Sequence, residues 1–183
     1  MKKQPEVTNA TRQKFIDVFC ELYEQKPIEK ITIQELTRKS GFSRSTFYQY
    51  FCDIYDLLDY VENDILKYIN TKIIEDKNFS SPNLQCIINV FEEKEKYFNA
   101  LLGKYGSINF LERLKQEIPV ERIGWNLDET DPIDSYLTEF YVTTTLSLFR
   151  LWQKKGHDLP PEQIFDLILR LRSDGINDII KNS

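Results

Sequence analysis

Apolar residues recur every three or four positions along most of this 183-residue chain, which is the spacing of one face of an α-helix. Between residues 9 and 25 this spacing predicts a helix with a largely aromatic face. Between residues 53 and 75 it continues over about six turns and predicts one long helix. The apolar positions of the two segments are Phe15, Phe19, Leu22, Tyr23, Ile54, Leu57, Leu58, Val61, Ile65, Ile69 and Ile73. The sequence contains no alternating run of β-branched residues bounded by turns, so we expect an all-α fold.

The middle of the chain predicts shorter helices separated by polar residues and glycine. Ser81 followed by Pro82 is a favoured helix start, so we expect a helix through residue 91 and a second one through residue 102. Another helix is expected over residues 107–118, after a turn that contains two glycines.

Two later segments are apolar on more than one face. After a looser connection over residues 119–131, we expect helices over 133–155 and from Pro160 onward, with Gly156 ending the first of them. In that helix one apolar face contains Leu137, Phe140, Tyr141, Leu148, Leu151 and Trp152, and another contains Val142, Leu146 and Phe149. Because such helices are usually buried on two sides, we expect the last two helices to form a subunit interface.

Residues 32–51 contain a helix-turn-helix pattern. Thr32 followed by Glu35 is a capping box, in which each side chain satisfies a backbone N–H at the start of a short helix. Gly41 lies where that helix must end in a left-handed conformation, which glycine adopts without steric penalty. Ser43 then caps a second short helix. The second helix of such motifs enters the DNA major groove, so the segment indicates a transcriptional regulator.

The charge of the chain is distributed unevenly. Residues 1–52 carry nine Lys or Arg against six Asp or Glu, a net charge of +3, whereas residues 53–183 carry 15 against 23, a net charge of −8. Most non-specific affinity for DNA comes from cations that neutralise phosphates. We therefore expect a DNA-binding domain over residues 1–52 and a separate helical control domain over residues 53–183.

Composition argues against several other classes of protein. No stretch approaches the roughly 18 consecutive apolar residues of a membrane span, and the first residues lack the apolar segment of a signal peptide. We expect a cytoplasmic protein without membrane association. The chain has no CxxC pair among Cys20, Cys52 and Cys86, so we expect three free thiols. The Cys52 thiol is expected to be unreactive, and the alternative is that it has a redox role. The single histidine, His157, argues against a metal site.

The run Gly-Phe-Ser-Arg-Ser-Thr-Phe-Tyr-Gln-Tyr-Phe at residues 41–51 resembles the signature of the TetR family of bacterial transcriptional regulators. The resemblance extends over roughly residues 9–60, and residues 97–118 are similar to one branch of the family. It implies an all-helical homodimer with about nine helices per subunit, in which the first three bind a palindromic DNA operator and the last two pair with the partner subunit. It also implies a helical body that binds a small-molecule effector.

Eight residues correspond by position to DNA contacts of that family: Thr32, Ser43, Arg44, Ser45, Thr46, Tyr48, Gln49 and Tyr50. Their chemistry agrees with this role. Arg44 can donate two hydrogen bonds to guanine, Gln49 can pair similarly with adenine, and Tyr48 can contact a phosphate or a thymine methyl group. Two alternatives stay open, namely that Arg44 is only a solvated charge and that Tyr50 is a core residue. Phe47 and Phe51, spaced four apart, are expected in the core.

The chain departs from the family pattern at two positions, one of them among these eight. Many members carry a phosphate-binding lysine where this chain has Ile54, and many carry glycine where it has Ser45. Either another cation replaces the missing lysine, with Lys2, Lys3, Arg12 and Lys39 as the candidates, or the affinity for DNA is weaker.

Aromatic and polar residues of the body are candidates for the lining of an effector pocket. The residues selected are Phe91, Phe98, Asn109, Phe110, Phe140, Tyr141 and Thr144. Effector pockets are mostly apolar with a few polar groups that orient the ligand, and this set has that composition. The alternative is that the aromatic members are ordinary core residues.

These features leave three candidate functions. The first is a ligand-responsive repressor that binds a palindromic operator as a homodimer. The second is a DNA-binding co-regulator or activator controlled by a protein partner. The third, an enzyme, lacks support because the sequence contains no nucleophile elbow, Walker loop or GxGxxG motif, and we expect no cofactor.

Overall fold

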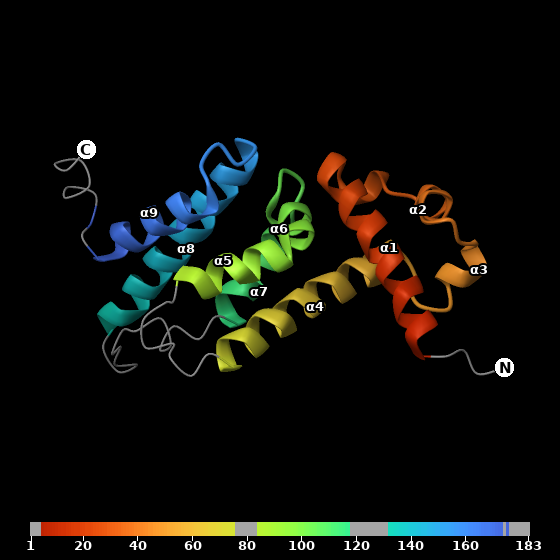
Figure 1. Cartoon of the computed structure of the whole chain (residues 1–183), viewed down its shortest axis with the longest axis horizontal. Helices are drawn as coiled ribbons and strands as arrows, with labels where there is room; N and C mark the ends of the chain where they lie inside the picture. The colour runs from red at the N-terminus through yellow and green to blue at the C-terminus, as the bar shows by residue number, and fades with distance from the viewer. Residues whose placement is uncertain (1–4, 76–83, 118–131, 174, 176–183) are drawn as a thin grey trace. The chain divides into compact units, whose positions relative to one another are not determined.

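The computed structural model describes residues 5–75, 84–117, 132–173 and 175. These residues form nine α-helices and one short 3-10 helix and contain no β-strand, so the predicted all-α fold is confirmed (Figure 1). The predicted helix start at Ser81 and Pro82 and the predicted connection over 119–131 lie outside the described residues, as do Lys2 and Lys3.

The helices follow the predicted order closely. Their bounds are α1 Pro5–Gln25, η1 Ile28–Lys30, α2 Ile33–Ser40, α3 Arg44–Phe47, α4 Ile54–Glu75, α5 Leu84–Glu93, α6 Glu95–Leu102, α7 Ile108–Glu117, α8 Pro132–Lys154 and α9 Pro161–Ser173. The long helix predicted over residues 53–75 is α4. None of the helices in the described ranges is long and apolar enough to cross a membrane.

The helices group into two compact units, which we call unit 1 and unit 2. Unit 1 contains Met1–Tyr68 and Lys94–Phe110, and unit 2 contains Ile69–Glu93 and Leu111–Ser183. Helix α6 therefore belongs to the same compact unit as α1. The expected division after residue 52 concerns DNA binding rather than packing, and it stays a prediction.

Phe15 of α1 lies at the centre of the unit 1 core and is fully buried. Its ring centroid lies 5.3 Å from that of Phe42 and 5.5 Å from that of Phe47. The ring of Phe51 lies 6.5 Å away. Aromatic pairs at such separations add to the gain from burying apolar area. The aromatic face of α1 therefore holds α3 and the residues on either side of it.

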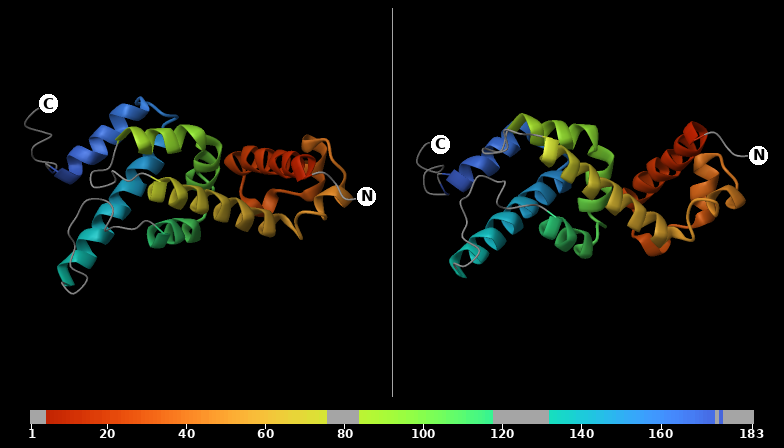
Figure 2. Two further views of the ribbon diagram at one scale, coloured as in Figure 1. Left: turned by 60° about the horizontal axis from the view of Figure 1, so that its bottom comes forward. Right: turned by 90° about the horizontal axis from the view of Figure 1, so that it is seen from below.

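Helix α6 packs against α1 within unit 1 (Figures 1 and 2). Five of its residues are buried: Tyr97, Phe98, Ala100, Leu101 and Leu102. Gln13 Nε2 of α1 donates to the Tyr97 hydroxyl at 3.4 Å, and Lys96 Nζ lies 3.9 Å from Glu21 Oε1. Burial raises the pKa of the Tyr97 hydroxyl, and the hydrogen bond from Gln13 acts in the opposite direction.

Helices α5, α8 and α9 surround an aromatic cluster in unit 2. The ring centroid of Phe91 lies 5.2 Å from that of Phe149 and 5.1 Å from that of Trp152. Phe165 of α9 completes the cluster at 6.1 Å from Phe91. The indole N–H of Trp152 donates to the Leu159 carbonyl at 2.8 Å, so the polar edge of the buried indole is satisfied.

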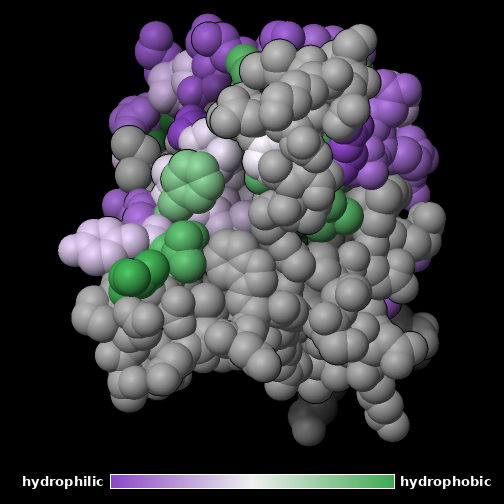
Figure 3. All heavy atoms as spheres, turned by 90° about the vertical axis from the view of Figure 1, so that its left-hand side faces the viewer, coloured by the Kyte–Doolittle hydropathy of each residue, from purple (hydrophilic) through white to green (hydrophobic). Residues whose placement is uncertain are grey.

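Opposite faces of α8 differ in exposure. One face is buried and contains Val142, Leu146, Phe149 and Trp152. Another face carries exposed apolar residues, which we call the α8 stripe: Ile133, Tyr136, Leu137, Phe140 and Leu151. Trp152, predicted on the same face as Phe140, instead lies on the buried face. Figure 3 views the side of the molecule that is on the left in Figure 1, and apolar side chains reach the surface there.

Candidate nucleic-acid interface

Helix α2 begins at the predicted cap. The backbone of Thr32 is extended, with φ −109° and ψ 146°, and its Oγ1 accepts a hydrogen bond from the Glu35 backbone N–H at 3.2 Å. The Glu35 carboxylate pairs with the ammonium group of Lys26, which directly follows the last residue of α1. Only the threonine half of the predicted capping box is therefore formed by these contacts, and the glutamate instead ties α2 to the segment before it.

The turn between α2 and α3 depends on Gly41. Its φ is +76°, in the left-handed region, and its N–H donates to the Thr37 carbonyl at 3.1 Å. The N–H of Phe42 donates to the same carbonyl at 3.2 Å. The chain then turns so that the Phe42 ring contacts Phe15, and Ser43 is placed to start α3. The predicted glycine turn is confirmed.

Helix α3 is short, and its hydrogen-bond pattern continues beyond it. Ser43 Oγ accepts from the Thr46 backbone N–H at 3.0 Å, which confirms the predicted cap. After Phe47, backbone N–H groups up to Phe51 still donate to carbonyls three or four residues earlier. We call residues 44–50 the recognition segment.

The recognition segment has one buried side and one exposed side. Phe47 is fully buried, and Phe51 just after the segment is 3% exposed, so the predicted core role of both is confirmed. Exposed residues of the eight DNA-contact candidates are Thr32, Ser43, Arg44, Ser45, Tyr48 and Gln49. Thr46 and Tyr50 are half-buried. The exposed side therefore presents a cation, an amide, a phenol and several hydroxyl groups.

Tyr50 occupies a position between core and surface. Its ring lies 6.2 Å from Phe15, and the Arg12 guanidinium lies over it at 5.7 Å from the centroid. The same guanidinium lies 5.4 Å from the ring of Tyr60 on α4. Arg12 therefore joins α1, the recognition segment and α4 through cation–π contacts. This environment favours a supporting role for Tyr50, while its contact with DNA stays a prediction.

Arg44 is bonded to a residue that the sequence analysis did not select. Its Nη2 donates to Oε1 of Gln34 on α2 at 3.4 Å, and both side chains are exposed. The two residues lie ten positions apart on different helices, so neither periodicity nor motif spacing indicated the contact.

The effector-pocket candidates are divided between the two units. Unit 1 contains Phe98, Asn109 and Phe110, and unit 2 contains Phe91, Phe140, Tyr141 and Thr144. Phe91, Phe98 and Phe110 are buried, Tyr141 and Thr144 are half-buried, and Asn109 and Phe140 are exposed. The pocket itself stays a prediction. Phe140 is 67% exposed and belongs to the α8 stripe.

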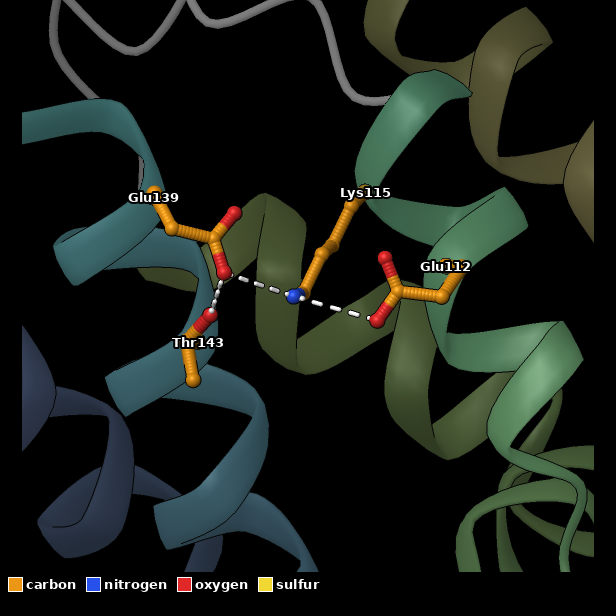
Figure 4. A network of polar contacts seen from close by, with 4 residues as sticks. All are labelled: Glu112, Lys115, Glu139 and Thr143. Carbon is orange, nitrogen blue, oxygen red and sulfur yellow. Dashed lines mark hydrogen bonds and ion pairs between the residues drawn. The ribbon is translucent and has the colours of Figure 1, made fainter. Parts of the chain in front are cut away.

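A polar network missed by the sequence analysis links α7 and α8 in unit 2 (Figure 4). Lys115 Nζ lies 2.9 Å from Glu139 Oε1 and 3.3 Å from Glu112 Oε1. The hydroxyl of Thr143 donates to the same Glu139 oxygen at 2.7 Å. The bonds from Lys115 and Thr143 lower the pKa of Glu139, and the Glu139 carboxylate raises the pKa of Lys115. Within the described ranges, no group of His, Cys, Asp or Glu has the arrangement of a metal site.

The capped α2, the glycine turn and the exposed side of α3 define a helix-turn-helix DNA-binding regulator. Residues 15–61 match the family model described as bacterial regulatory proteins, tetR family. Residues 15–61 therefore form a TetR-family helix-turn-helix DNA-binding domain. Residues 41–51, on which the resemblance to the TetR family rests, lie within the matched range and include α3 and the turn that precedes it.

Solved structures with the same fold cover nearly the whole chain. A TetR transcriptional regulator from Streptococcus agalactiae 2603V is 19% identical, with a TM-score of 0.65 over 91% of this chain and 95% of that one. The dihydroxyacetone kinase operon activator DhaS is 15% identical, with a TM-score of 0.55 over 91% of this chain and 96% of that one. No curated protein matches the chain by sequence.

Proposed function

We propose that this chain is a cytoplasmic repressor that binds a palindromic operator as a homodimer and releases it when a small molecule binds. In this proposal residues 1–52 bind DNA, and residues 53–183 bind the effector and pair with the second subunit. The observation that carries the proposal is the exposed side of the recognition segment, which the buried Phe47 and Phe51 hold on the core of unit 1.

The recognition segment supplies the groups that distinguish base pairs. Arg44 is the first residue of α3, and N-terminal residues of a recognition helix meet base edges in the major groove. Its guanidinium matches guanine O6 and N7, and the Gln49 amide matches adenine N6 and N7. Tyr48 contacts phosphate or a thymine methyl group. The hydroxyl groups of Thr32, Ser43, Ser45 and Thr46 donate to phosphates and fix the register.

The α8 stripe supports pairing of two subunits through the last two helices. Its members are large apolar side chains that stay exposed in the single chain, Tyr136 by 75% and Phe140 by 67%. A contiguous exposed apolar patch indicates an interaction site. A two-fold symmetric dimer buries the same patch on both subunits and presents two recognition segments to half-sites about 34 Å apart.

The body is the proposed site of the small-molecule effector. The candidates within unit 2 are Tyr141, Thr144 and the buried ring of Phe91, those within unit 1 are Asn109, Phe98 and Phe110, and Phe140 lies instead on the α8 stripe. An effector shifts the equilibrium only by its preference for one conformation of the dimer. Release from DNA therefore requires a pocket that differs between the DNA-bound and the effector-bound conformation.

A protein-controlled activator or co-regulator is the second candidate function. DhaS, which shares the fold, is named as an operon activator. In this alternative the helix-turn-helix is unchanged, while a protein partner takes the place of the small molecule and recruits the transcription machinery.

The test is selection of binding sites from random duplex DNA with the purified 183-residue chain. The selected site is then titrated at several salt concentrations, because phosphate contacts make the affinity fall with salt. Recovery of one palindrome, bound by two subunits, supports the proposal. Recovery of no site by a folded dimer contradicts it.

A second measurement separates the two candidate functions. Promoter fragments containing the selected operator are transcribed in vitro with and without the protein. Repression that a pool of small metabolites relieves supports the effector-controlled repressor. Stimulation of transcription, or relief only by a protein fraction, supports the alternative.

A further inference from the structure

The contact between α2 and α3 involves two exposed side chains, Gln34 and Arg44. Nη2 of Arg44 donates to Oε1 of Gln34 at 3.4 Å. Gln34 is the second residue of α2 and Arg44 the first residue of α3, so both belong to the first turns of the two motif helices. In a helix-turn-helix protein the N-terminal residues of the second helix contact base edges and the first helix crosses the DNA backbone, so a pair that joins the two first turns lies close to DNA.

The amide partner leaves the positive charge of Arg44 intact. The carboxylate next to Gln34 in the chain is that of Glu35, and it pairs with Lys26. Arg44 is therefore oriented by a neutral acceptor rather than by a carboxylate. A guanidinium oriented in this way keeps its attraction for DNA and has fewer rotamers to lose on binding.

Donors remain available on both partners after this hydrogen bond forms. A guanidinium has five N–H donors, and one of them is used here. An amide whose oxygen accepts a hydrogen bond still has two N–H donors. The pair thus presents two sets of donors side by side, one of which fits the O6 and N7 acceptors of guanine.

We propose that Gln34 is a specificity-determining residue of the DNA interface. Its amide oxygen positions Arg44 on a guanine, and its amide N–H donates to an acceptor on the neighbouring base pair, either thymine O4 or a purine N7. The pair then determines two adjacent positions of each half-site. This inference rests on the proposed operator binding and adds a residue of α2 to the base contacts.

The test repeats the binding-site selection with Gln34→Ala, Gln34→Glu and the wild-type chain. Gln34→Ala removes both functions, so we expect a loss of affinity for the wild-type operator of about 5- to 100-fold, with weaker base preference at two adjacent positions. Gln34→Glu keeps the acceptor for Arg44 but replaces the donor. We therefore expect it to retain guanine at the Arg44 position and to change the neighbouring preference to cytosine, whose N4 amino group donates to a carboxylate.

Gln25→Ala provides the matched control, because Gln25 is another exposed glutamine in unit 1 at the end of α1. It should select the wild-type operator with unchanged affinity. Circular dichroism of each variant confirms folding before titration.

The outcomes are distinguishable. A Gln34→Ala variant with wild-type affinity and preferences overturns the inference, and so does an equal loss of affinity for every sequence. A Gln34→Glu variant that selects the wild-type neighbouring base overturns the proposed contact between the amide and that base. Failure of the wild-type chain to select any site contradicts the proposed function itself.

Discussion

Substitutions within the recognition segment are expected to change either DNA binding or folding stability, depending on the residue. Arg44 is exposed and bonded to a neutral amide, so its removal leaves no buried charge unpaired and opens no cavity. Phe47 is fully buried, and replacing such a residue by alanine removes about 3–5 kcal/mol of stability. Effects of Arg44 variants on DNA binding therefore report a contact, whereas effects of Phe47 variants report folding.

Arg44→Ala is expected to weaken operator binding by about 1–3 kcal/mol and to relax base preference at one position per half-site. The physical reason is loss of the bidentate contact to guanine. Competition titration against operators with each base at that position measures both effects. Arg170→Ala, which removes an exposed arginine from α9, is the charge-matched control. Unchanged affinity and preference in Arg44→Ala would leave it as a solvated charge.

The thiols of Cys20 and Cys52 are expected to react at very different rates. Burial, and then nearby carboxylates, raise the pKa of the Cys20 thiol from its ordinary value of 9.0 to about 12, whereas Cys52 is exposed. Because the thiolate is the reactive form, alkylation at pH 8 should modify Cys52 and leave Cys20 intact in the folded protein. Peptide mass spectrometry after timed alkylation measures both sites. Equal rates would contradict the burial of Cys20.

The same shift predicts a dependence of stability on alkaline pH. A thiol with a raised pKa in the folded state stabilises that state fully below pH 9.0, and this contribution is lost as pH rises toward about 12. Urea unfolding at pH 8 and pH 10.5 should show a smaller decline for Cys20→Ala than for the wild-type chain. Cys52→Ala is the control, with a decline equal to that of the wild type.

At the scale of elements, local signals and distant contacts contribute differently to the helix-turn-helix. The caps Thr32 and Ser43 and the turn glycine act within four residues of themselves, and all three could be predicted from the sequence. The end of α3 could not be predicted, because the turn after Phe47 keeps helical hydrogen bonds. The pairing of Glu35 with Lys26 was missed because the capping box assigned the same carboxylate to Thr32.

Gly41→Ala is expected to lower the free energy of unfolding by about 1 kcal/mol, because a left-handed backbone is unfavourable for residues with a Cβ. The φ of Gly41 is +76°, and an added Cβ would meet nothing within 4 Å, so the effect is conformational rather than steric. Chemical denaturation followed by circular dichroism measures it.

Two further glycine variants make this measurement specific. Gly41→Asn should be less destabilising than Gly41→Ala, because asparagine tolerates the left-handed region better. Gly156→Ala, with φ +71° and equally open space, applies the same change to unit 2. A Gly41→Ala chain as stable as the wild type would contradict the turn geometry.

At the scale of the whole molecule, the sequence predicted which helices exist but not which of them pack together. The membership of α6 in unit 1 depends on Tyr97 and Gln13, which lie 84 positions apart. No periodicity indicates such a contact. The effector-pocket candidates were selected by residue type, and for that reason they include both the core residue Phe91 and the surface residue Phe140.

The surplus of apolar residues on α8 did indicate more than one apolar face. One face is buried with Phe149 and Trp152, and the other is the α8 stripe. A monomer that exposed this stripe would be prone to non-specific association, so a defined partner is expected to cover it. In the proposed dimer a second copy of the chain covers the stripe without any further protein, and it also supplies the second recognition segment that a palindrome requires.

Phe140→Glu is expected to weaken the dimer by about 3 kcal/mol, or more than 100-fold, because each subunit would bury an unpaired carboxylate in the interface. The change should not unfold the subunit, since Phe140 is 67% exposed in the single chain. Sedimentation equilibrium measures the dissociation constant. Tyr55→Glu is the control, because Tyr55 is an aromatic residue of α4 that is 56% exposed and lies outside the α8 stripe.

The same variant separates dimerisation from DNA recognition. Because the recognition segment is unchanged, a Phe140→Glu chain should still contact a single half-site, but its affinity for the full palindrome should fall to nearly that for the half-site. The loss of affinity follows from effective concentration, because two linked recognition segments bind DNA far more tightly than one. A Phe140→Glu chain that remains a dimer and binds the palindrome normally would place the subunit interface elsewhere than on the α8 stripe.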